Sequence, residues 1–158
     1  MKTKFAPIIL LVILSSFLFE ACSSSPRFTS NKNRSNIISV KNIEDLSKYE
    51  GYPVLETKTG VASFYADKYN GRITYSGEVY DMNGISGAHP SYQMNTIVRI
   101  TNLENDKHVI LRINDKMPER GDDRIIDVSL GTAKELDFVE KGLVKVKIEV
   151  LEWGNGRK

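Results

Sequence analysis

Three stretches of the chain alternate apolar and polar residues with a period of two, which is typical of strands with one buried face. The clearest lies near the C-terminus, where Val144, Val146, Ile148 and Val150 alternate with charged residues. Residues 96–101 and 108–113 alternate in the same way on either side of an Asn/Asp turn, which predicts a hairpin. Two short apolar runs, at 61–65 and 124–128, predict further strands.

One short helix is predicted before the last strand. Ser129 is placed to cap it, and Leu130, Ala133 and Leu136 fall near one side. Short strands with a single helix favour a small, mainly β domain, and closing the sheet into a barrel removes bare strand edges. We therefore expect one domain over residues 58–153, followed by a tail at 154–158.

The first 21 residues have the pattern of an export signal. Lys2 and Lys4 precede an apolar run at 8–19, which is short for a membrane-spanning helix. The run leads to Cys22, the only cysteine of the chain, and its surroundings resemble the bacterial lipobox, in which this thiol is diacylated. We expect a signal peptide at 1–21 and lipidation of Cys22; an ordinary cleaved signal with an incidental cysteine is the alternative.

Residues 22–57 are expected to link the anchor to the domain. Positions 23–36 are rich in Ser, Asn and basic residues, a composition that buries little and is typical of a flexible tether. Over the whole chain, 22 Lys and Arg nearly balance 20 Asp and Glu, and no dense basic run occurs. This balance argues against a nucleic-acid partner, because such partners require a basic surface.

The residues suited to acid–base chemistry lie in loops or at the end of a strand. Glu78 follows a Ser-Gly turn, Asp81 comes three residues later, His89 lies in a second loop, and Asp115 ends a predicted strand. Loops mounted on a rigid sheet are where catalytic groups concentrate. Each also has a structural alternative, because acids at such positions often cap their own turns.

Several other chemistries lack the residues they need. The chain has no G-x-S-x-G motif, no glycine-rich phosphate loop after a strand, and no second cysteine for a Cys/His nucleophile pair. Its two histidines are nineteen residues apart, without H-E-x-x-H, so we expect neither a metal nor a cofactor. Carboxylates with one histidine suit general acid–base work on a glycosidic bond.

The motifs of the domain occur in the same order as in a known family. They resemble those of the rare lipoprotein A (RlpA) domain: Gly60-Val-Ala-Ser-Phe-Tyr65, Asn70-Gly-Arg-Ile-Thr74, Ser76-Gly-Glu78, Ala88-His89, Arg112-Ile-Asn-Asp115 and Arg124-Ile-Ile-Asp-Val-Ser129. The resemblance covers nearly the whole region 60–150. It implies a six-stranded double-psi β-barrel, a fold also seen in expansins, with one or two short helices. It also implies action on peptidoglycan in the bacterial cell envelope.

The resemblance further implies an endolytic lytic transglycosylase active in cell-wall organisation and septation. Active members cut the β-1,4 bond between N-acetylmuramic acid (MurNAc) and N-acetylglucosamine (GlcNAc) without adding water, leaving a 1,6-anhydro end. Some prefer strands that lack stem peptides. By motif, Asp115 is the acid/base, Glu78 supplies an anion or positions the sugar, and His89 orients a carboxylate or binds substrate. An acid of this kind needs a pKa raised by burial or by a nearby anion.

Five further residues are expected to bind substrate or to support these three. Tyr65 and Tyr75 are candidates for stacking on sugar rings, with packing as the alternative. Asp81 is a supporting or structural acid, and Arg112 and Asn114 belong to the same motif as the proposed acid/base. The partners implied are glycan strands and, through the N-terminal lipid, the outer membrane on its periplasmic side; we expect a monomer.

The chain departs from the family pattern at four positions. Lys116 and Met117 stand where the family has Arg and Gly, Tyr75 stands where a small residue is usual, and Phe64 stands where Trp is usual. The glycine allows close approach of backbone to glycan, so Met117 bears directly on the shape of the groove. A lipoprotein that binds glycan without cleaving it is the alternative to the enzyme.

Overall fold

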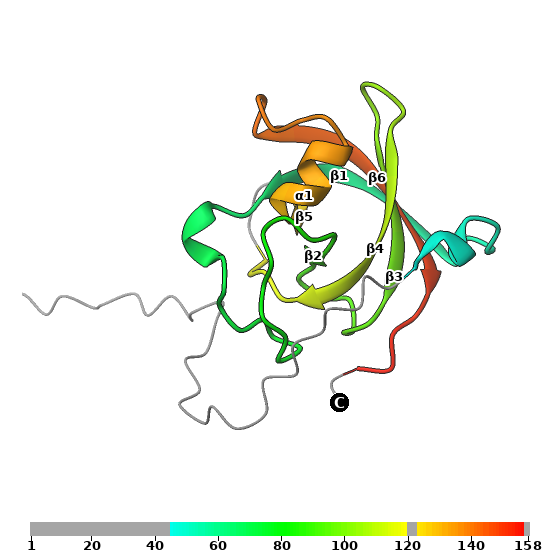
Figure 1. Ribbon diagram of the computed structural model, residues 1–158. Helices are drawn as coiled ribbons and strands as arrows, with labels where there is room; N and C mark the ends of the chain where they lie inside the picture. The colour runs from blue at the N-terminus through cyan, green and yellow to red at the C-terminus, as the bar shows by residue number, and fades with distance from the viewer. Residues whose placement is uncertain (1–44, 120–122, 157–158) are drawn as a thin grey trace, which may run out of the picture.

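The computed structural model describes residues 45–119 and 123–156. The expected signal peptide, Cys22 and most of the linker lie outside the described residues. The described part is built mainly from strands (Figure 1), which are β1 (Glu56–Phe64), β2 (Gly87–Ala88), β3 (Ile97–Asn102), β4 (His108–Asp115), β5 (Arg124–Val128) and β6 (Leu143–Glu152). The helical elements are α1 (Leu130–Glu135) and two 3-10 turns, η1 (Ser47–Tyr49) and η2 (Asp67–Tyr69). None of these is long and apolar enough to cross a membrane.

The six strands close into one barrel in the order β1-β5-β2-β4-β3-β6. β1 runs parallel to β5 and β2 parallel to β4, whereas the other neighbouring pairs are antiparallel. Closure gives every strand a partner on both sides, which removes the free edges that the sequence analysis expected the fold to avoid. The predicted mainly β, six-stranded double-psi barrel is therefore confirmed.

The barrel interior is filled by the alternating residues of the strands. The predicted inward face of β6 is buried throughout, with Val146, Ile148 and Val150 fully inaccessible. Ala133 and Leu136, near the predicted apolar side of the helix, enter the same core, and α1 contacts β1 and β4. The period-two pattern of β6 and two of the three helix positions thus identify core residues, whereas Leu130 is only partly buried.

Two elements differ from the sequence-based expectation. β1 begins at Glu56 rather than near Val61, and it pairs with β6 along that length, with Glu56 opposite Val150. The first half of β1 is exposed and polar, so backbone pairing rather than an apolar face makes it a strand. β2 lies in a region expected to be loop, because two residues, Gly87 and Ala88, are too few to show a period.

The end of the expected linker lies against the barrel. Tyr49 is buried and packs with Leu46 on Ile97, Ile110 and Leu151, outside the main core. The carbonyl oxygen of Glu50 also accepts a hydrogen bond of 2.7 Å from Arg99. Residues 46–50 are therefore packed against β3, β4 and β6 rather than extended away from them.

The start of α1 is tied to the chain that leads into β2. Ser129 caps the helix as predicted, accepting a 3.1 Å bond from the Thr132 backbone N–H, and its hydroxyl donates to the Gly84 carbonyl at 2.6 Å. The Gly131 N–H donates to the Met82 carbonyl at 2.8 Å. The close approach needs glycine, because a Cβ at position 131 would lie 2.4 Å from the Asn83 carbonyl oxygen.

We predict that Gly131→Ala lowers the free energy of unfolding by about 2 kcal/mol, since two backbone segments must separate to admit the methyl group. Urea unfolding followed by circular dichroism measures the change. Gly51→Ala is the matched control, because no atom lies within 4 Å of a Cβ at that position. Equal unfolding midpoints for the two variants would show that the contact with residues 82–84 is not tight.

Candidate active site

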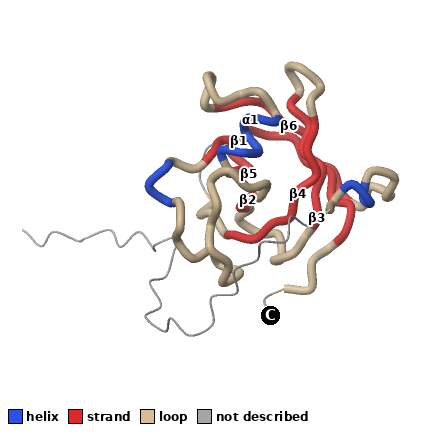
Figure 2. Tube along the Cα trace, in the orientation of Figure 1, coloured by secondary structure: helices blue, strands red, loops and turns tan. Residues whose placement is uncertain are grey.

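Glu78, His89 and Asp115 are far apart in the sequence and meet at one end of the barrel. Asp115 is the last residue of β4, and its parallel partner on β2 is Ala88, which immediately precedes His89. The His89 N–H donates to the Asp115 carbonyl at 3.3 Å. The connection from β1 to β2, which is loop except for η2 (Figure 2), carries Glu78 to the same end. Parallel pairing of β2 with β4 thus brings His89 to Asp115, whereas Arg112 and Asn114 of β4 hold Glu78 at the same end.

The carboxyl group of Asp115 is almost completely buried, with 1% of the residue exposed. Its Oδ1 accepts hydrogen bonds from the backbone N–H groups of Tyr75 at 2.9 Å and Lys116 at 2.8 Å. Its Oδ2 accepts a bond of 3.1 Å from the Tyr65 hydroxyl. Donors therefore reach both oxygens of this carboxyl group, two at Oδ1 and one at Oδ2.

Glu78 forms a bidentate ion pair with Arg112. Its Oε1 lies 2.9 Å from Arg112 Nη1, and its Oε2 accepts bonds of 3.1 Å from Arg112 Nη2 and from Asn114 Nδ2. Burial alone would raise the pKa of Glu78, but the hydrogen bonds from these two residues and the guanidinium charge outweigh it and lower the pKa. Glu78 is therefore ionised, with its charge balanced by Arg112.

A further contact holds Arg112 in place. Its Nη1 donates to Asn95 Oδ1 at 3.1 Å, and the Asn95 amide donates to Asn155 Oδ1 and to the Gly156 carbonyl, both at 3.3 Å. Asn95 has a φ of +70°, an uncommon conformation that its short polar side chain tolerates. The segment after β6 thus supports the ion pair through Asn95, a residue that the sequence analysis did not identify.

His89 is buried and neutral, and its ring orientation is fixed. Its Nδ1 accepts two backbone N–H bonds, from Ser91 at 3.2 Å and Tyr92 at 3.1 Å, so the neutral ring carries its proton on Nε2. Burial, with the nearby charges of Lys58 and Lys116, lowers the pKa of His89 to about 3. At neutral pH His89 is a hydrogen-bond donor through Nε2 and not a base.

Tyr92 is a second residue that the sequence analysis missed. Its ring stacks on His89 with centroids 3.6 Å apart and planes 8° from parallel. The Tyr92 hydroxyl donates to Glu56 at 2.8 Å, and Lys116 Nζ donates to the Tyr92 carbonyl at 2.6 Å. No pattern in the sequence reveals the stacking, because it depends on the turn that follows Pro90.

Of the other predicted residues, Tyr65 is buried, whereas Tyr75 and Asp81 are exposed. Tyr65 is buried, so its hydroxyl supports Asp115 while its ring packs on Tyr80 at 5.1 Å. Tyr75 is 44% exposed. Asp81 is exposed and accepts a 2.9 Å bond from the Asn83 N–H, so it closes its own turn.

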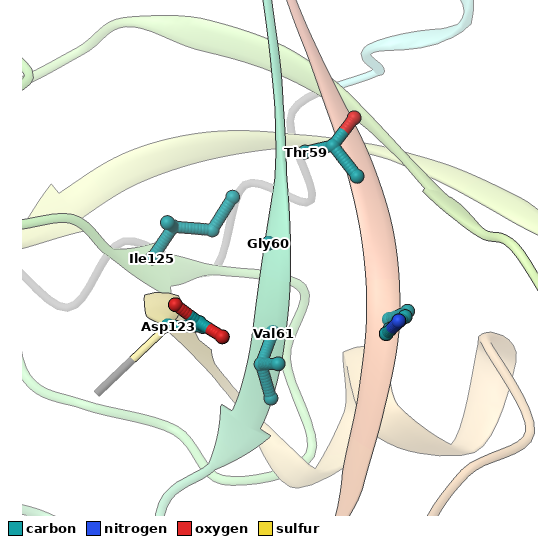
Figure 3. A pocket seen from close by; sticks show the side chains of 6 residues that line it. Thr59, Gly60, Val61, Asp123 and Ile125 are labelled. Carbon is teal, nitrogen blue, oxygen red and sulfur yellow. The ribbon is translucent and has the colours of Figure 1, made fainter.

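The pocket shown in Figure 3 is lined by none of these residues. In 45–119 and 123–156, no three His, Cys, Asp or Glu side chains are grouped so as to hold a metal ion. The pocket in Figure 3 has a volume of about 480 Å³ and lies along β1. It is lined by Thr59, Gly60, Val61, Asp123, Ile125 and Lys145.

The barrel places the protein in the double-psi β-barrel class. Among solved structures, it is similar to the Streptomyces papain inhibitor, with a TM-score of 0.52 and 18% identity over 64% of this chain and 99% of that one. It is also similar to a Clavibacter michiganensis expansin in complex with cellohexaose, with a TM-score of 0.50 and 13% identity over 65% and 54% of the two chains. At these identities the likeness shows the fold alone.

Sequence comparison identifies the family within that class. Residues 57–148 match the family model described as lytic transglycolase. A Neisseria meningitidis protein named endolytic peptidoglycan transglycosylase RlpA is 48% identical over 59% of this chain and 38% of its own length. A Rickettsia bellii protein of the same name is 34% identical over 96% of this chain and 75% of its own length. The chain therefore belongs to the RlpA-like lytic transglycosylase family.

Some relatives are much longer than this chain. The chain spans 36% of the Campylobacter jejuni protein of that name, with 40% identity over the 100 aligned residues, and a similar share of the Neisseria protein. The family model covers residues 57–148, which include Glu78, His89 and Asp115.

We predict that stability falls as the pH is lowered from 7 to 5, partly because of His89. In this range the unfolded chain gains a proton on this histidine, whereas the folded one, with its pKa near 3, does not. The free energy of unfolding should therefore decrease by about 2 kcal/mol more in the wild type than in His89→Gln. Urea unfolding at the two pH values measures this difference.

If His89→Gln does not fold, the protonation state of His89 can be measured directly in the wild type. Ring signals of His89 in NMR spectra of the wild type should keep their neutral, Nε2-protonated shifts from pH 8 to pH 5. A titration of these signals near pH 6.5 would contradict the assignment.

Proposed function

We propose that this barrel is an endolytic lytic transglycosylase that cleaves the β-1,4 bond between MurNAc and GlcNAc in glycan strands of peptidoglycan. The observation that carries the proposal is the buried carboxyl of Asp115, flanked by Glu78 and His89 at one end of the barrel. The relatives that match this domain bear the name of that activity, which supports the same conclusion.

Asp115 is the proposed acid and base. Its Oδ2 delivers a proton to the glycosidic oxygen as the bond between that oxygen and the MurNAc anomeric carbon breaks. The resulting carboxylate then takes the proton of the MurNAc C6 hydroxyl, whose oxygen bonds to the anomeric carbon. The proton that was donated is thereby recovered, the 1,6-anhydro ring closes, and no water is consumed.

Glu78 and His89 act on the sugar rather than on the transferred proton. The Glu78 carboxylate is ionised, so it can accept a sugar hydroxyl and stabilise positive charge that develops at the anomeric carbon. The Nε2–H of His89 donates to a sugar oxygen or to the N-acetyl carbonyl. Tyr75 is exposed, and its backbone N–H is bonded to Asp115. Its ring is therefore a candidate for stacking on a sugar near the reacting bond.

A barrel that binds glycan without cleaving it is the second candidate. Exposed Tyr75 and the His89 donor would serve binding equally well. The buried Asp115 favours the enzyme, because binding does not require a carboxyl group to be withdrawn from water and carboxyl burial is costly. Burial of the Asp115 carboxyl therefore supports the enzyme over a barrel that only binds glycan.

The decisive variant is Asp115→Asn. We predict that purified residues 23–158 release 1,6-anhydro-ended fragments from peptidoglycan and from peptide-stripped glycan, and that the variant releases at least about a hundredfold less. Mass analysis of the soluble fragments gives the measurement. Asp106→Asn is the charge-matched control in the exposed turn between β3 and β4. Binding without fragments would support the second candidate, and reducing ends would indicate a hydrolase.

We also propose that Cys22 carries a lipid that holds the domain in the outer membrane, facing the glycan strands of the periplasm. The position of Cys22 after the apolar run at 8–19 supports this anchor. Cys22→Ser should move the protein from the membrane fraction of cells to the soluble fraction, as judged by immunoblotting. An unchanged distribution would count against lipidation and leave the cleaved-signal alternative.

A further inference from the structure

An exposed aromatic residue lies next to the candidate active site and has no role in the chemistry described above. Trp153 follows β6 directly, is 44% exposed, and is the only tryptophan of the chain. Its ring meets Tyr92 edge-on, with centroids 5.3 Å apart and planes at 86°. Ile97 pairs with Arg112 of β4 and with Glu152 of β6, so these two strands end on the same side of the barrel (Figure 1). Trp153, which follows Glu152, therefore lies on the side that carries Asp115.

A continuous series of contacts links Trp153 to the reacting groups. Trp153 touches Tyr92, the Tyr92 ring stacks on His89 at 3.6 Å, and the His89 N–H bonds to the Asp115 carbonyl. The backbone N–H of Tyr75, which is 44% exposed, donates to the Asp115 carboxyl group. Two exposed aromatic residues are therefore linked to the proposed acid/base, Tyr75 through its backbone and Trp153 through Tyr92 and His89.

The Trp153 position is held by its neighbours before any ligand arrives. Tyr92, against which it packs, is fixed by its bond to Glu56, and the Gly154 N–H donates to Thr96 Oγ1 at 3.1 Å. Leu151, two residues earlier, is buried. A ring placed in advance loses little conformational freedom on binding, which favours affinity.

We propose that Trp153 forms an outlying subsite that stacks on another sugar ring of the same glycan strand, away from the bond that is cleaved. This inference rests on the proposed function. Pyranose rings present C–H faces that pack on the electron-rich face of an aromatic ring. His89 and Tyr92 are buried, so Trp153 is the exposed ring of this series that a strand leaving Asp115 in that direction would meet. Contacts remote from the reacting bond can then contribute to catalysis on long chains.

The kinetic test compares long and short substrates. Trp153→Ala should raise KM about threefold to tenfold for long peptide-stripped glycan, with a smaller effect as the chain shortens. Trp153→Phe, which keeps a ring, should recover most of the loss. Leu143→Ala is the matched control, because Leu143 is 55% exposed at the opposite end of β6 and should keep the wild-type ratio of long-chain to short-chain kcat/KM. A length-independent loss in kcat would instead assign Trp153 a structural role through Tyr92.

A binding test uses the single tryptophan as a reporter. Glycan fragments of increasing length are added to Asp115→Asn, which binds without turnover, and emission is recorded. Long fragments should shift the emission to shorter wavelength by covering Trp153, and the shortest should not. Binding, measured by calorimetry, without any emission change would overturn the subsite alone. If Asp115→Asn does not bind glycan and the wild type does not cleave it, the proposed function itself is overturned.

Discussion

The buried carboxyl group of Asp115 is the constraint on which this end of the barrel depends. A carboxyl withdrawn from water must be hydrogen-bonded, and each bond left unmade would cost about 1–3 kcal/mol. The donors come from three places: the Tyr65 hydroxyl just after β1, the Tyr75 N–H in the loop, and the Lys116 N–H after β4. Satisfying one buried group therefore fixes the positions of segments that are distant in the sequence.

The polar groups around this carboxyl are kept in different charge states by their surroundings. Glu78 stays ionised because Arg112 and Asn114 donate to it, whereas His89 stays neutral because it is buried near Lys58 and Lys116. The sequence analysis expected Glu78 either to supply an anion or to position the sugar. The first role is weakened, because Arg112 balances the negative charge of Glu78. Glu78 and Asp115 therefore differ in environment, since Glu78 is half-buried in an ion pair whereas Asp115 is almost completely buried among neutral donors.

Prediction from the sequence succeeded for elements that a single local requirement determines. The alternation in β6 and the Ser129 cap each follow from local chemistry, and both are found as expected. β2 could not be predicted, because two residues show no period and become a strand only between β5 and β4. The stacking of Tyr92 on His89 and the support of Arg112 by Asn95 escaped prediction for a similar reason. Both depend on backbone turns that bring a residue to a partner with no detectable sequence signal.

Met117 shows how a departure from the family pattern is accommodated. A side chain at a position where the family has glycine was expected to alter the glycan groove. In the structure, however, Met117 is 4% exposed and packs with Tyr65, Tyr80 and Ala88 in a cluster outside the main core. The Met117 side chain is therefore buried in this cluster rather than exposed to a ligand. Because the cluster includes Tyr65, Met117 packs beside the residue whose hydroxyl is bonded to Asp115.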